Sequence, residues 1–102
     1  MSENEISKLV FESGLKEQGI KVERQKNISI EYEELVIEKA FRLDLLIEDK
    51  VIVEIKAVPE INSYHTYQLL NYLRITGCKL GLVLNFHSVL FKDGVKRIAN
   101  NL

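Results

Sequence analysis

Three charged residues lie inside two apolar segments of the chain, where charge is normally unfavourable. They are Asp44, Glu54 and Lys56, within the stretch "RLDLLIEDKVIVEIKA" at residues 42–57. Two carboxylates and an amine are the parts that metal-assisted hydrolysis of a phosphodiester requires. The carboxylates would hold Mg²⁺. The lysine would hold a phosphate oxygen, or orient and deprotonate the attacking water.

The register of a hairpin between these segments decides whether the two carboxylates can meet. A three-residue connection at 48–50 sets Asp44 opposite Glu54, on the same side of the sheet. A two-residue turn would set Asp44 opposite Ile55 and separate the apolar stripes onto opposite faces. The hydrophobic pattern selects the first register, which collects on one core face Phe41, Leu43, Leu45, Val51, Val53 and Ile55.

A simpler alternative treats the same charges as the solvated face of a hairpin. In the selected register Arg42 lies opposite Lys56, so the four charges could form a neutral ladder exposed to water. Two carboxylates with Cβ atoms about 5 Å apart are unfavourable on their own, and a divalent cation between them would reverse that. The pattern alone leaves both interpretations open.

Apolar periodicity along the chain predicts the elements that must position these residues. In chain order they are a helix at 5–18, strands at 20–32, 36–47 and 51–58, a helix ending near 76, a strand at 79–86 and a closing hairpin at 88–100. The order α-β-β-β-α-β-β indicates an α+β domain with a mixed sheet and helices packed on it. We expect residues 1–102 to form this single domain.

Capping and turn residues support the later part of this assignment. Asn62 or Ser63 can cap the second helix, and Gly77 closes it. Asp93-Gly94 is the turn signal of the closing hairpin.

Composition restricts the class of protein without identifying its function. The chain has 102 residues, of which 46% are hydrophobic and 28% charged, as in a soluble globular domain. No apolar run approaches the roughly 20 residues needed to span a membrane, and the polar, acidic start does not resemble a signal peptide. Cys78 is the single cysteine, so no internal disulfide is possible, and we expect a cytoplasmic location.

Three segments, in order, resemble a known family. They are "RLDLLIEDKVIVEIKAV", "YQLLNYLRITGCKLGLVLNF" and "KDGVKRIAN", and the similarity covers about residues 15 to 99. The family is that of the GxxExxY proteins, a small prokaryotic group within the PD-(D/E)XK nuclease superfamily. A strand aspartate, a hairpin and then "EIK" is similar to the D…(D/E)xK core of that superfamily.

The resemblance implies a restriction-endonuclease-like fold and cleavage of nucleic acid with Mg²⁺ or Mn²⁺. Carried over to this sequence, it makes Asp44 and Glu54 metal ligands and Lys56 the catalytic lysine. The backbone carbonyl of Ile55 would be a further metal ligand.

The following helix offers Gln68 and Tyr72, whose spacing resembles the QxxxY motif of RecB-like members. Residues four apart share one helical face, which could look onto the site. Gln68 would then support catalysis, although it could equally be a surface residue. Tyr72 could equally be a core residue whose hydroxyl reaches the edge.

One departure from the family pattern affects the first helix. The chain has no GxxExxY motif, and the segment between "NEISKLV" and "GLKEQGI" that would contain its glutamate is missing. Glu5 and Glu12 are the only acidic residues on the shortened helix ahead of its last turn, and neither matches the motif. Activity could therefore be weak, completed by a second chain, or lost.

The leading hypothesis is a metal-dependent nuclease or a descendant of one. The rival is a non-catalytic nucleic-acid-binding or dimerisation module with the same fold. The expected partner is nucleic acid, with DNA favoured over RNA and little base specificity, and no membrane. A homodimer is a further alternative, because a shortened helix could expose apolar sheet surface. Two basic groups could contact phosphates: Lys21, Arg24 and Lys26 on the first strand, and Lys92, Lys96 and Arg97 near the last hairpin.

Overall fold

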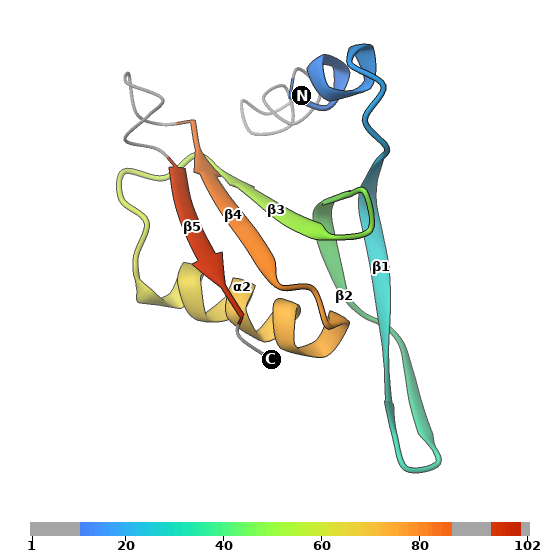
Figure 1. Cartoon of the computed structure of the whole chain (residues 1–102). Coiled ribbons are helices and arrows are strands. Elements are labelled where there is room, and N and C mark those ends of the chain that lie inside the picture. Colours follow the sequence, from blue (N-terminus) through green and yellow to red (C-terminus); the bar gives the residue numbers. More distant parts are fainter. Residues whose placement is uncertain (1–10, 87–94, 101–102) are drawn as a thin grey trace.

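A five-stranded mixed sheet forms the centre of the protein, with strands in the order β1-β2-β3-β4-β5 (Figure 1). The computed structural model describes residues 11–86 and 95–100. Neighbouring strands are antiparallel except for β3 and β4, which are parallel. The strands are β1 (Val22–Tyr32), β2 (Leu35–Ile47), β3 (Val51–Lys56), β4 (Leu80–Asn85) and β5 (Val95–Ala99). The predicted α+β class with a mixed sheet is confirmed.

Helix α2 (Ser63–Thr76) supplies the crossover that the parallel pair β3 and β4 requires. Asn62 is its N-cap: its side chain accepts a hydrogen bond from the His65 N–H, while the Asn62 N–H donates to Nδ1 of His65. Gly77 ends the helix in the left-handed conformation, with φ of 79°. Both predicted helix boundaries are confirmed, and of the two candidate caps the structure uses Asn62.

The core has two parts, one on each face of the sheet. The first cluster lies under α2 and consists of Leu43, Leu46, Ile52, Leu69, Leu73 and Val83. The second lies on the opposite face and consists of Leu45, Val53, Ile55 and Leu84. One predicted core face was to contain Phe41, Leu43, Leu45, Val51, Val53 and Ile55; this is wrong, because the first two pack in the first cluster and the other four in the second. Parallel strands joined by a helix are covered on both faces, so β3 contributes side chains to both clusters.

Side-chain alternation is reversed partway along the β1-β2 hairpin. Leu43 and Leu45 pack in different clusters, although their spacing predicts a shared face. In β1 the same reversal separates Val22 from Ile28, whose even spacing would otherwise put them on one side. Gln25 marks the position, because it has φ of 52° and is absent from the β1-β2 ladder pairs. A left-handed residue inside a strand breaks the alternation on which the prediction relied.

The connection between β2 and β3 has the predicted length. Ile47 pairs with Val51, which leaves three residues, 48–50, to make the turn. Glu48 and Asp49 have φ of 52° and 57°, the left-handed conformation that tight hairpin turns need. The register that the hydrophobic pattern selected is thus confirmed at this end of the hairpin.

The distal arm is the part of the β1-β2 hairpin that extends away from β3, and we define it as residues 30–38. Figure 1 shows it projecting from the body of the molecule. β3 pairs with β2 only from Leu45 to Ile47, so it gives no support to the arm. The exposed fractions of Leu35, Val36 and Ile37 are 61%, 53% and 46%.

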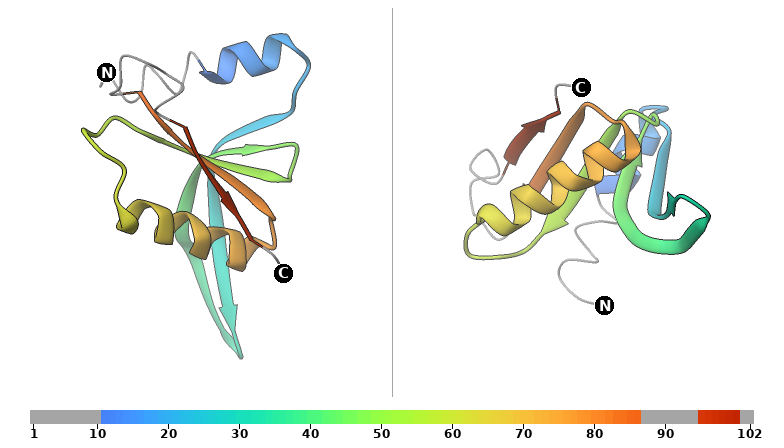
Figure 2. Two further views of the ribbon diagram at one scale, coloured as in Figure 1. Left: turned by 60° about the vertical axis from the view of Figure 1, so that its left-hand side comes forward. Right: turned by 90° about the horizontal axis from the view of Figure 1, so that it is seen from below.

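The first helix packs on the face of the sheet opposite α2, as the two views of Figure 2 show. Its described part is residues 11–17, and Phe11 packs against the second cluster. Gly19, which directly follows the predicted helix at 5–18, has φ of 76°. Glu5 and the Asp93-Gly94 turn lie outside the described residues. No helix in the described ranges is long and apolar enough to cross a membrane.

The close packing of α2 on β4 predicts opposite effects for two glycine-to-alanine substitutions. A Cβ at Gly81 would lie 2.9 Å from three side-chain atoms of the buried Leu69. We expect Gly81→Ala to lower the free energy of unfolding by about 1–3 kcal/mol through overpacking. Gly14 is helical with nothing within 4 Å of its would-be Cβ, so Gly14→Ala should raise stability by about 0.5–1 kcal/mol. Urea unfolding measures both, and shifts of equal sign would contradict this packing.

Candidate metal centre

The two predicted carboxylates meet where β2 separates from β3. The β2-β3 ladder pairs end at Leu45–Val53, and beyond them side chains take over the bonding. Asp44 Oδ2 accepts a hydrogen bond from the Ile55 N–H at 2.8 Å. The Asp44 N–H donates to Glu54 Oε1 at 3.4 Å. The structure therefore brings Asp44 and Glu54 together as their predicted register requires.

Glu54 is buried, with only 4% of its surface exposed. The interpretation of these charges as a solvated ladder is therefore wrong for Glu54. The predicted pairing of Arg42 with Lys56 also does not form, because the β2-β3 ladder ends before it; Arg42 pairs with Asn27 of β1.

The negative charge of the two carboxylates is not fully compensated by nearby positive groups. Burial and the neighbouring Asp44 carboxylate raise the pKa of Glu54 to about 8, and the Lys56 ammonium opposes the shift only in part. Two carboxylates this close in a desolvated place cannot both ionise easily. A divalent cation would satisfy both, and carboxylate oxygens are the ligands that Mg²⁺ prefers.

Helix α2 brings three further groups to this centre. Lys56 Nζ donates to Gln68 Oε1 at 3.4 Å, so Gln68 lies at the centre rather than out on the surface. Burial and the charge of Glu54 raise the pKa of the Tyr72 hydroxyl, and the nearby Gln68 side chain opposes this rise. The Tyr72 ring stacks on Phe41 with a centroid distance of 4.5 Å. Tyr72 is thus a core residue that also borders the centre.

Asn85 is a residue of the centre that the sequence reasoning missed. It pairs with Lys56 in the parallel register and is only 5% exposed. Its Oδ1 accepts from the Val58 N–H at 3.1 Å, and its Nδ2 donates to the Val58 carbonyl at 2.8 Å. Asn85 therefore fixes the segment that follows Lys56. The available signal was a polar residue at the carboxyl end of the apolar strand "KLGLVLN".

Glu12, one of the two glutamates ahead of the last turn of the shortened helix, forms ion pairs away from the candidate centre. It is 8% exposed and forms ion pairs with Lys16 at 2.7 Å and Arg24 at 3.5 Å. Its neighbour Phe11 packs on the sheet face opposite α2. Across residues 11–86 and 95–100, no group of three or more His, Cys, Asp or Glu side chains could hold a metal.

The basic group predicted on the first strand is engaged in ion pairs. Lys21 contacts Asp49 at 2.8 Å and Glu23 at 3.4 Å, and Lys26 contacts Glu23 at 2.8 Å. Arg24 forms the ion pair with Glu12 of the first helix. These side chains are therefore poor candidates for phosphate contacts.

The second basic group lies at the far edge of the sheet. Lys96 and Arg97 are exposed on β5, which β4 separates from β3, and Lys92 lies outside the described residues. Within the described part of the chain, neither Lys96 nor Arg97 takes part in a salt bridge.

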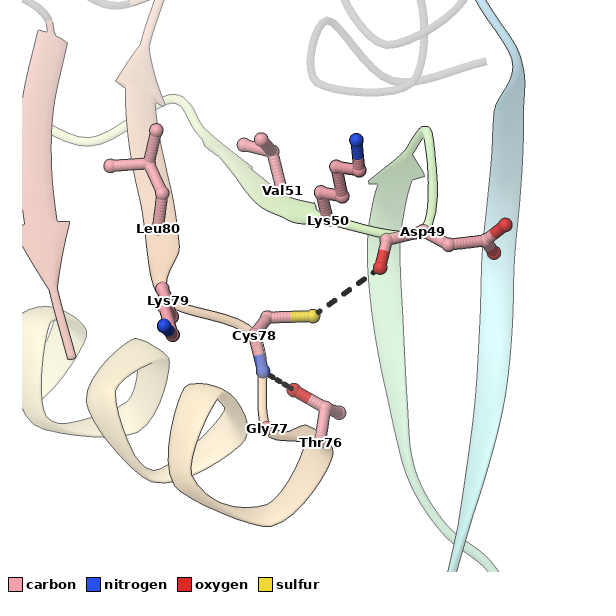
Figure 3. A pocket seen from close by; sticks show the side chains of 8 residues that line it. All are labelled: Asp49, Lys50, Val51, Thr76, Gly77, Cys78, Lys79 and Leu80. Atoms are coloured by element: carbon pink, nitrogen blue, oxygen red, sulfur yellow. Dashed lines mark hydrogen bonds between the residues drawn. The ribbon is translucent and has the colours of Figure 1, made fainter. Parts of the chain in front are cut away.

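A pocket of about 400 Å³ opens at the other end of the parallel strands (Figure 3). Val51 and Leu80 begin β3 and β4 there, whereas Lys56 and Asn85 end them at the candidate centre. The Cys78 thiol donates to the Asp49 carbonyl at 3.9 Å across this pocket. The pocket is therefore separate from the carboxylate pair.

Comparison with known proteins agrees with this arrangement. Residues 3–98 match the family model described as the PD-(D/E)XK nuclease superfamily. The chain belongs to this superfamily. The resemblance seen in the sequence is thereby confirmed at the level of the superfamily, together with its restriction-endonuclease-like fold. No curated protein matches this PD-(D/E)XK chain.

Among solved structures, the crystal structure of SSO0001 is similar to this PD-(D/E)XK domain. The TM-score is 0.69 and the sequence identity 23%, over 97% of the present chain. The chain spans 51% of the length of that protein. At this identity the similarity supports the fold and nothing more specific.

The raised pKa of Glu54 predicts a pH dependence of stability in the metal-free protein. A carboxyl whose pKa is higher when folded stabilises the fold fully below its unfolded pKa, near 4.5, and loses that contribution as pH rises through about 8. With EDTA present, we expect the free energy of unfolding to fall between pH 5 and 8.5 by on the order of a few kcal/mol. Glu54→Gln should remove most of this fall, measured by urea unfolding. The same fall in wild type and Glu54→Gln would contradict the assignment.

The role of Asn85 predicts a local effect on the segment after Lys56. Asn85→Ala leaves the N–H and carbonyl of Val58 without their partner, which we expect to cost about 1–3 kcal/mol of stability. Hydrogen exchange of the Val58 amide should accelerate more than that of core strand amides. Asn85→Asp keeps the acceptor and should retain more protection, while Asn71→Ala, at an exposed position of α2, serves as the control. Unchanged exchange at Val58 in Asn85→Ala would rule out this role.

Proposed function

We propose that the protein is a metal-dependent nuclease that hydrolyses phosphodiester bonds of nucleic acid. The observation that carries the proposal is the carboxylate pair, in which the buried Glu54 meets Asp44 and has its pKa raised to about 8. Within the superfamily we assign the chain to the GxxExxY group, on the three sequence segments that resemble it.

The donor set suits Mg²⁺ or Mn²⁺. Asp44 and Glu54 would hold the ion, and the backbone carbonyl of Ile55 would be a further ligand. A bound ion of this kind supplies Lewis acidity toward a phosphodiester oxygen. One or two carboxylates are a common protein contribution at such sites, with water and substrate phosphate completing the coordination.

The remaining groups of the centre would act on the substrate or on one another. Lys56 is close enough to affect the pKa of Glu54 and donates to Gln68. Its ammonium would stabilise negative charge developing on the phosphate, or orient the attacking water. Gln68 would direct that ammonium through its side-chain oxygen, and Tyr72 would hold Gln68 in turn. Asn85 would fix the backbone from which Lys56 projects.

We propose DNA as the preferred substrate and weak sequence specificity. The described helices pack on the faces of the sheet, and none projects as a recognition helix that could enter a groove. Contacts to phosphates would position the nucleic acid without reading its bases.

A second candidate function is a nucleic-acid-binding or dimerisation module without catalysis. The position of Glu12 favours it, because this residue pairs with Lys16 and Arg24 on the sheet face opposite α2. Among the described residues the centre then has two acidic side chains, and neither comes from the first helix. Such a module would not need a divalent ion between Asp44 and Glu54.

Cleavage of single- and double-stranded DNA and RNA tests the proposal directly. The assay compares Mg²⁺, Mn²⁺ and EDTA for wild type, Lys56→Ala and Lys79→Ala; Lys79 is an exposed lysine lining the separate pocket. We expect cleavage that requires the metal, decreases at least ~100-fold in Lys56→Ala, as for a lost charge-stabilising group, and persists in Lys79→Ala.

Metal binding measured alongside cleavage separates the two candidate functions. Mg²⁺ should raise the melting temperature of wild type at pH 8.5 but not that of the variant Asp44→Asn/Glu54→Gln. Metal binding without cleavage on any substrate would point to a metal site in an inactive domain. Neither metal binding nor cleavage, in a folded protein, would favour the non-catalytic module.

A further inference from the structure

The distal arm combines exposed apolar residues with a uniform negative charge. Its sequence, "IEYEELVIE" at residues 30–38, has four glutamates and no lysine or arginine. Leu35, Val36 and Ile37 are each close to half exposed or more. No salt bridge within the described residues involves an arm glutamate. Exposed apolar side chains gathered on a projecting strand are typical of an interaction surface.

Nucleic acid is an unsuitable occupant for this surface. A phosphate backbone is attracted by lysine and arginine and is repelled by glutamate. The arm would therefore weaken nucleic-acid binding wherever it approached the backbone. A protein surface that is basic and partly apolar fits the arm better.

The chain itself carries such a surface at the opposite edge of the sheet. β5 reads "VKRIA", with Lys96 and Arg97 exposed and Val95 41% exposed. β5 is an edge strand: among residues 11–86 and 95–100 only β4 pairs with it, and no described strand pairs with its outer side. We call residues 95–97 on that outer side the β5 edge. It is basic and partly apolar, and so complements the acidic and partly apolar arm.

The two surfaces cannot meet within one copy. β1 and β5 are the two edges of the sheet, with three strands between them. In Figure 1 and in the right-hand view of Figure 2 the arm and β5 lie on opposite sides of the molecule. Contact between them therefore requires two copies of the chain.

We propose that the distal arm of one copy docks along the β5 edge of a second copy, and that the exchange is reciprocal. Reciprocity gives two identical contacts and a closed two-fold dimer, whereas a single contact would leave one arm and one edge unused. Docking of an extended segment on an open edge supplies main-chain hydrogen bonds, and the charges select the partner. The inference is independent of the proposed catalytic activity.

A charge-reversal experiment on the whole chain tests the proposal. The arm-reversed variant is Glu31→Lys/Glu33→Lys/Glu34→Lys/Glu38→Lys, which makes the arm positive, and the edge-reversed variant is Lys96→Glu/Arg97→Glu. Sedimentation velocity over a wide concentration range gives the mass of each and of their mixture. We expect wild type to be a dimer and each variant alone to be a monomer, because its arm and edge carry the same sign.

The mixture of the two variants is the decisive sample. Each arm then meets an edge of opposite charge, so the mixture should regain the dimer mass, which also shows that both variants are folded. The control Glu17→Lys/Glu60→Lys shifts the net charge in the same direction as the arm-reversed variant, at exposed positions outside both surfaces, and should remain dimeric.

Several outcomes would overturn the proposal. A wild-type protein that stays monomeric at every concentration would show that the proposed dimer does not form. An edge-reversed variant that remains dimeric shows that the arm binds elsewhere, for example to a second arm. A mass that keeps growing with concentration indicates an open chain of copies in place of the reciprocal dimer.

Discussion

The hydrogen bond from the Ile55 N–H to the Asp44 carboxylate, at 2.8 Å, is the contact on which the rest of the structure depends. It lies just beyond Leu45–Val53, the last pair of the β2-β3 ladder, and joins Asp44, one residue past Leu45, to Ile55, two residues past Val53. A side chain thus replaces a backbone partner, which leaves β2 free to separate from β3. Glu54 remains buried next to that carboxylate, and its raised pKa is the electrostatic consequence.

The separation of β2 from β3 also explains the shape of the domain. Beyond this point β2 pairs only with β1, and the hairpin continues as the distal arm. Gln25, with φ of 52°, lies in β1 between the residues that pair with Leu45 and Leu43, and so next to Asp44 in the register. The reversal of faces therefore occurs at the same level as the carboxylate pair. An irregularity of strand geometry beside a functional centre is a common way to re-aim side chains.

The two helices contribute unequally to the candidate centre. Helix α2 covers one side of it through Gln68 and Tyr72, and Phe41 stacks behind Tyr72. The first helix packs on the other face of the sheet, where Glu12 is held by Lys16 and Arg24. The candidate centre thus brings together two carboxylates and a lysine without an acidic contribution from the described part of the first helix. Charge elsewhere is segregated, with an acidic arm and a basic β5 at opposite edges, although the net charge of the chain is only -1.

The sequence by itself determined the features that depend on local chemistry. The order of elements, the caps of α2, the three-residue connection and the meeting of Asp44 with Glu54 all follow from periodicity, capping residues and turn length. Tertiary structure decided which face each side chain occupies, because a glutamine in the left-handed conformation and a parallel partner for β3 leave no local signal. It also decided that Asn85 holds Val58 and that Lys21, Arg24 and Lys26 are paired with carboxylates. Those contacts join residues far apart in the chain, and only the packed sheet brings them within reach of one another.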